Sequence, residues 1–75
     1  MTKVQDIINA ISDEDLRDMV AELHELGNTG VLPGAKVRNL ALSISNQVDI
    51  SIHDSLTIAQ TSVLRMAAFK WAGVQ

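Results

Sequence analysis

Apolar residues recur at the spacing of helical turns in the first part of the chain. Four of them occupy positions i, i+3, i+4 and i+7 and so share one helix face: Val4, Ile7, Ile8 and Ile11. Ser12 then precedes three acidic residues, which is typical of a helix start because the hydroxyl caps free amides and the acids lie near the positive end of the helix dipole. The pattern predicts one helix over residues 3–11 and a second beginning at residue 13.

The second helix carries a regular apolar stripe and is rich in acids. The stripe consists of Leu16, Met19, Val20, Leu23 and Leu26. Outside it lie Arg17, Asp18, Glu22 and Glu25, which we expect to face water. Gly27 is predicted to end this helix at residue 26 as a left-handed cap, and the glycine-rich stretch 27–34 is predicted to be a loop.

A third helix is predicted over residues 34–47, beginning near Pro33. Its stripe consists of Val37, Leu40, Ala41, Ile44 and Val48. Val48, Ile50 and Ile52 then alternate with polar residues. An isolated strand is not stable, so this segment is predicted to be an extended connector with inward-pointing isoleucines. Asp54 or Ser55 is expected to cap the last helix, over residues 55–72.

The last helix is apolar on more than one side. One stripe consists of Leu56, Ala59, Val63, Met66 and Ala67, and a second of Leu64, Ala68 and Trp71. A helix with two apolar sides needs two covering surfaces, and in so short a chain the second is expected to come from another subunit. The patterns together predict an all-α fold: one helical domain over residues 1–75, a small bundle of about four helices with a C-terminal helical hairpin, assembled as a homo-oligomer.

Composition narrows the classes of function. The 75 residues include no cysteine, which excludes disulfides and thiolate zinc sites, and the formal net charge is −3. A negative chain is repelled by the phosphates of duplex nucleic acid, so binding to a duplex is not expected. No apolar run reaches the ~20 residues that span a bilayer, and a signal-peptide pattern is not recognised. We therefore expect a cytoplasmic protein without a membrane partner.

Residues with catalytic or metal-binding chemistry are few and scattered. His24 and His53 lack the further ligands that a zinc site needs. The acids at 13–15 point about 100° apart on a helix, so they do not converge. No nucleophile elbow, P-loop or Ser–His–acid pattern is recognisable. The sequence therefore predicts a protein that is not an enzyme and carries neither a metal nor a cofactor.

Several polar residues could instead form an anion-binding pocket. Lys36 and Arg38 lie at the start of the third helix, and Arg65 and Lys70 project from the last one. Across a hairpin or a subunit interface they could converge, with Thr61 as a hydroxyl donor and Trp71 as a stacking face. The alternative is that the charges only keep the surface solvated and that Trp71 lies in the core.

The C-terminal half of the chain also resembles a known family. Its segments AKVRNL at 35–40 and LTIAQT at 56–61, followed by Trp71-Ala72, resemble the helical-hairpin anti-CBASS/anti-Thoeris proteins of bacteriophages. The resemblance implies a non-enzymatic helical oligomer that sequesters a cyclic nucleotide or cyclic ADP-ribose-type signal, in the host cytoplasm if the chain is phage-encoded. The N-terminal helix, the loop at 27–34 and the absence of a basic-proline tail after Trp71 depart from the family pattern.

Two hypotheses of function follow. In the first, an oligomer sequesters a small anionic nucleotide through Lys36, Arg38, Thr61, Arg65 and Trp71. In the second, the chain is a small protein-binding inhibitor, anti-CRISPR-like or regulatory, that presents an acidic helix to a basic protein surface. That helix would use Asp13, Glu14, Asp15, Asp18, Glu22 and Glu25. A structural or assembly subunit is a third possibility.

Overall fold

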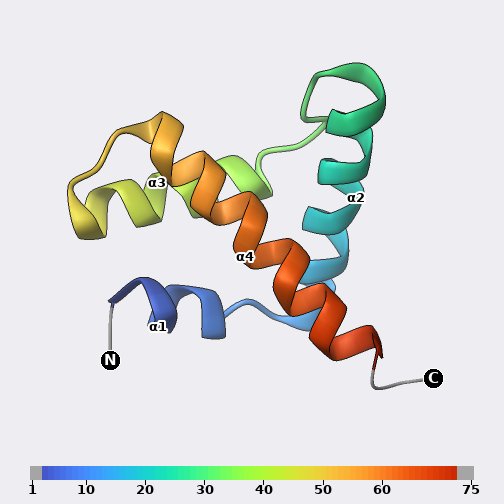
Figure 1. The fold of residues 1–75 in the computed structure, drawn as a ribbon, viewed down its shortest axis with the longest axis horizontal. Helices are drawn as coiled ribbons and strands as arrows, with labels where there is room; N and C mark the ends of the chain where they lie inside the picture. The colour runs from blue at the N-terminus through green and yellow to red at the C-terminus, as the bar shows by residue number, and fades with distance from the viewer. Residues whose placement is uncertain (1–2, 73–75) are drawn as a thin grey trace.

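The computed structural model describes residues 3–72, which form four α-helices and no strand. The helices are α1 (Lys3–Asn9), α2 (Asp13–Thr29), α3 (Lys36–Val48) and α4 (Ile52–Ala72). α4 crosses α3 diagonally, and its C-terminal part packs against α2, while α1 packs against α3 (Figure 1). The molecule is a slab of 37 × 32 × 16 Å, about two helices thick. The predicted all-α fold of about four helices is confirmed.

One apolar core joins α2, α3 and α4. Its fully buried apolar side chains are Leu16, Val37, Ala41, Ile44, Ala59 and Val63. α1 adds Ile8 at the edge, with Val4 and Ile7 packed more loosely. These residues belong to the predicted stripes, so the helical periodicity identified the core correctly.

The two ends of α2 differ in how well the sequence predicted them. At its start, the Ser12 hydroxyl accepts a hydrogen bond from the Asp15 amide at 3.1 Å, which confirms the predicted cap. At its end, the prediction of a cap at Gly27 is wrong. The helix continues through Thr29, and Gly30 holds the left-handed conformation with φ 78° while its amide donates to the Leu26 carbonyl at 2.8 Å. Glycine permits a left-handed cap but does not impose one, so the helix ran on to the later glycine.

The extended connector predicted between the last two helices is also wrong. α3 continues to Val48, and a short turn over 49–51 leads directly into α4, with Asp49 left-handed at φ 53°. Ser51, rather than Asp54 or Ser55, caps α4: its hydroxyl accepts from the Asp54 amide at 3.1 Å. Val48 and Ile52 are exposed, and only Ile50 packs on the core. The alternation of apolar and polar residues over 48–52 therefore does not mark an extended segment. It spans the end of α3, a turn and the start of α4.

The outward side of α4 is left uncovered by the chain itself. Leu64 and Ala68 of the predicted second stripe are exposed, and Phe69 is 79% exposed. Trp71 is half-buried and packs against the core, as the alternative interpretation of this residue expected. Among the described helices, none is both long and apolar enough to cross a membrane.

The two glycines at the end of α2 give opposite expectations. Gly27→Ala should raise the free energy of unfolding by about 0.5–1 kcal/mol, because alanine favours a helix interior and a Cβ there meets no atom within 4 Å. Gly30→Ala should lower it by about 1 kcal/mol, because its φ is positive. Urea denaturation followed by circular dichroism measures both, and shifts of the same sign would show that the cap is misplaced.

Candidate functional site

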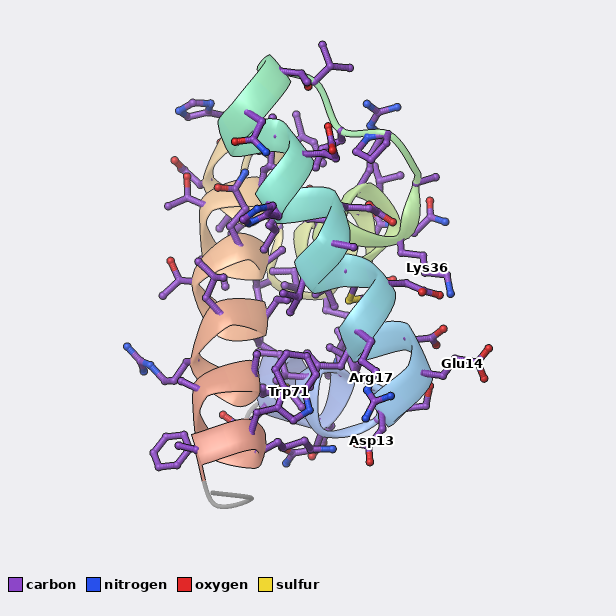
Figure 2. All side chains as sticks on the ribbon, turned by 90° about the vertical axis from the view of Figure 1, so that its right-hand side faces the viewer. Asp13, Glu14, Arg17, Lys36 and Trp71 are labelled. Atoms are coloured by element: carbon purple, nitrogen blue, oxygen red, sulfur yellow. The ribbon has the colours of Figure 1, made fainter. Side chains whose placement is uncertain are left out.

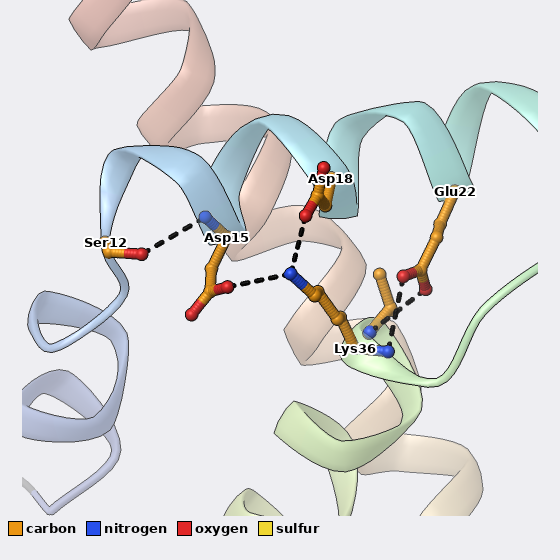
Figure 3. A network of polar contacts seen from close by, with 6 residues as sticks. Ser12, Asp15, Asp18, Glu22 and Lys36 are labelled. Atoms are coloured by element: carbon orange, nitrogen blue, oxygen red, sulfur yellow. Dashed lines mark hydrogen bonds and ion pairs between the residues drawn. The ribbon is translucent and has the colours of Figure 1, made fainter.

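The acids of α2 hold the start of α3 through Lys36. The Lys36 ammonium lies between two carboxylates, 2.9 Å from Asp15 Oδ1 and 2.5 Å from Asp18 Oδ2 (Figure 3). The hydrogen bond from Lys36 lowers the pKa of Asp15, and the hydrogen bonds to Asp18 and Asp15 raise the pKa of Lys36. All three side chains are partly exposed to solvent, so this cluster is a pair of surface salt bridges that links α2 to α3.

Glu22 makes a second and more buried tie one turn further along α2. The residue is only 6% exposed, and its carboxylate accepts from two backbone amides in the first turn of α3, those of Lys36 at 3.3 Å and Val37 at 3.2 Å (Figure 3). Ala35, the residue at the start of that turn, has no polar side chain that could cap it. Glu22 therefore caps the turn from another helix. The prediction that Glu22 faces water is therefore wrong, because the free amides of α3 compensate the loss of hydration.

The acidic face of α2 is largely occupied within the molecule. Besides the contacts to Lys36 and α3, Asp13 pairs with Lys70 near the end of α4, and this hydrogen bond lowers the pKa of Asp13. Of the six acids proposed to meet a basic partner, four thus bind groups of their own chain. The other two of these six, Glu14 and Glu25, have carboxylates without a partner among residues 3–72.

A cleft between α1 and α4 brings together two of the predicted ligand-binding residues. It has a volume of about 320 Å³, and Thr61 and Arg65 of α4 both line it. Its other walls are Gln5 and Ile8 from α1 and Ser62, Met66, Phe69 and Lys70 from α4. The Arg65 guanidinium has no ion-pair partner among residues 3–72, whereas the Lys70 ammonium is held by Asp13. The cleft therefore combines apolar walls, hydroxyl and amide groups, and one available cation.

The other predicted site residues do not join this cleft. Lys36 and Trp71 lie on opposite sides of α2 (Figure 2). Trp71 is placed between α4 and α2, and Lys36 points away from α4 toward Asp15 and Asp18. Arg38 is an exposed residue of α3 and is not among the residues that line the cleft. Within one chain, the predicted set of five residues therefore does not form a single pocket.

Sequence reasoning missed Glu22 and the α1 side of the cleft. Glu22 lies three positions after Met19 and four before Leu26, two members of the apolar stripe, and this spacing places it on the flank of the buried face. Nothing comparable marks Gln5 or Ile8, because their position beside α4 depends on how α1 packs against α3.

The buried cap can be tested with two matched substitutions on α2. Glu22→Gln should lower the free energy of unfolding by about 1–3 kcal/mol, because an amide group replaces a charged acceptor at two backbone amides. Glu25→Gln, on an exposed carboxylate of the same helix, should change it by less than about 0.5 kcal/mol. Urea unfolding at neutral pH measures both. Equal effects would mean that Glu22 does not cap α3.

Among residues 3–72, no group of three or more histidine, aspartate or glutamate side chains is arranged to hold a metal ion. No protein-family model, curated protein or solved structure matches the chain. The geometry of the cleft and the resemblance of the segments at 35–40 and 56–61 are therefore the observations that bear on function.

Proposed function

We propose that this chain is a non-enzymatic binding protein that sequesters a small anionic ligand of the cyclic-nucleotide class, and that it does so as a homo-oligomer. The observation that carries the proposal is the cleft between α1 and α4, in which the unpaired Arg65 guanidinium lies beside Thr61. The resemblance to phage counter-defence proteins supports this ligand class. It rests on the segments at 35–40 and 56–61, and the second of these includes Thr61.

The chemistry of the cleft suits an anion with an apolar part. A guanidinium binds phosphate oxygens through a planar set of donors, and a hydroxyl can add a further hydrogen bond. Ile8, Met66 and Phe69 supply apolar contact area, which suits a nucleobase or sugar ring. No histidine or carboxylate is among the described residues that line the cleft, so a general base for hydrolysis is not provided there. Binding without turnover is the function that these groups support.

The alternative of an acidic surface for a basic protein is less well supported. Asp13, Asp15 and Asp18 are each engaged by a lysine of their own chain, and Glu22 is buried against α3. A basic partner would have to displace these contacts before it could use the charges. Loss of the Glu22 cap would also weaken the attachment of α3 to α2.

The exposed side of α4 supports self-association. Leu64, Ala68 and Phe69 are exposed on a helix whose opposite face forms the core, and the slab is only 16 Å thick. Small domains often gain stability by burying such surface against a second copy. The expected interface includes Leu64 and Ala68, while Trp71 contributes less than expected because it packs within its own chain.

The ligand proposal is tested by isothermal titration against cyclic di- and trinucleotides and cyclic ADP-ribose isomers. Arg65→Gln should weaken binding about ten- to a hundredfold, because a charge-assisted contact to phosphate contributes about 1.5–3 kcal/mol. Arg38→Gln is the matched control and should leave the affinity unchanged, because Arg38 does not line the cleft. Absence of heat with every ligand would contradict the proposal. Equal losses in the two variants would show that the ligand binds elsewhere.

A further inference from the structure

Lys70 belongs to the wall of the α1–α4 cleft, but its charge is bound by a residue outside that wall. Both Lys70 and Arg65 line the cleft. The Lys70 ammonium donates a hydrogen bond to Oδ1 of Asp13, which lies in the first turn of α2 and is not a lining residue. The Asp13 carboxylate therefore competes for Lys70 with any anion that enters the cleft.

Arg65 and Lys70 flank the apolar wall that α4 contributes to the cleft. They are five positions apart, so they point about 140° apart around the helix, and Met66 and Phe69 lie between them. A lysine carries its charge on a flexible four-carbon stem, so the ammonium can turn from Asp13 toward the cleft while the helix stays in place. An anion whose apolar part packs on Met66 and Phe69 would then have a cation on either side.

The ion pair between Lys70 and Asp13 is open to solvent. The Asp13 side chain is 75% exposed and the Lys70 side chain 41%. Surface ion pairs stabilise a protein little, because water also solvates the separated charges. The hydrogen bond from Lys70 is the main cause of the lowered pKa of Asp13, and the charge of the nearby Arg17 lowers it further (Figure 2). Asp13 would keep water and Arg17 around it after Lys70 turns away, so no buried charge is left unpaired.

Lys36 is held more firmly than Lys70 and lies elsewhere. Its ammonium lies between the carboxylates of Asp15 and Asp18, whose hydrogen bonds raise its pKa, and it does not line the α1–α4 cleft. Lys70 has one carboxylate partner among residues 3–72 and lies at the cleft. Of these two lysines, Lys70 is therefore the one that a ligand in the cleft can recruit.

We infer that Lys70 is a second anion-binding residue of the α1–α4 cleft, and that a phosphate ligand displaces the Asp13 carboxylate from the Lys70 ammonium. This inference rests on the proposed function and names a contact that regulates the same site. Asp13 lowers the affinity of the cleft for anions, and only a ligand that binds Lys70 better than a carboxylate does gains the second cation. Because the pair joins α2 to α4, ligand binding also removes this link between the two helices.

Inorganic pyrophosphate tests the exchange, since it presents phosphate oxygens without a nucleobase. Its affinity is measured at constant ionic strength from the shifts of backbone amides in nuclear magnetic resonance spectra. Asp13→Asn releases Lys70 and should tighten binding about two- to fivefold, the factor that a surface ion pair contributes. Lys70→Gln should weaken binding about tenfold, because a charge-assisted contact is lost. Glu14→Gln is the matched control: it removes the adjacent exposed carboxylate, which holds no lysine, and should leave the affinity unchanged.

The double variant with both Asp13→Asn and Lys70→Gln separates the exchange from a general effect of net charge. If Asp13 acts through Lys70, the double variant should bind pyrophosphate like Lys70→Gln alone. The exchange would be overturned by a gain in affinity that persists in the double variant, by an equal gain in Glu14→Gln, by an unchanged affinity in Lys70→Gln, or by no binding to the native chain. Any of these results, together with nucleotide binding that depends on Arg65, would leave the proposed function standing. The expected pattern without binding of any nucleotide would support the exchange and contradict the proposed ligand class.

Discussion

The contact between the Glu22 carboxylate and the first turn of α3 is the constraint on which the rest of the structure depends. It joins two helices across an irregular loop, at 3.3 Å and 3.2 Å from the amides of Lys36 and Val37. A buried carboxylate is costly unless its oxygens are hydrogen-bonded, and these amides compensate that cost. Gly34 is part of the same arrangement, because a Cβ there would lie 2.8 Å from Glu22 Oε2. The glycine of the loop thus leaves room for the carboxylate that fixes α3.

This tie also decides which charges are available for function. With Glu22 on α3, Lys36 lies within reach of Asp15 and Asp18, and a cation that could have bound a ligand is neutralised within the chain. Asp13 likewise neutralises the Lys70 ammonium within the chain. Arg65 is left as the available cation of the cleft, and the outward side of α4 is left uncovered. Because the acids of α2 pair with Lys36 and Lys70, we expect both ligand binding and self-association to use α4.

The sequence predicted those features that depend on neighbours along the chain. Helical periodicity located the stripes of α2 and α4 that bury Leu16 and Val63, and the serine before three acids located the start of α2. Features that depend on distant segments were missed or misplaced. Glu22 is buried because α3 presents free amides to it, and the Arg65 cleft exists because α1 lies beside α4. Between Gly27 and Gly30 the local pattern had no means of choosing, because both residues can adopt a left-handed cap.

The most direct test of this account is the hydrogen exchange of the Lys36 and Val37 amides, measured by nuclear magnetic resonance. Amides in the first turn of a helix have no partner within that helix and normally exchange quickly with water. If Glu22 caps α3, both amides should be protected in the native chain, and at least one of them should lose that protection in Glu22→Gln, whose side chain keeps a single acceptor oxygen, while the amides inside α3 stay protected. Fast exchange of both amides in the native chain would contradict the account.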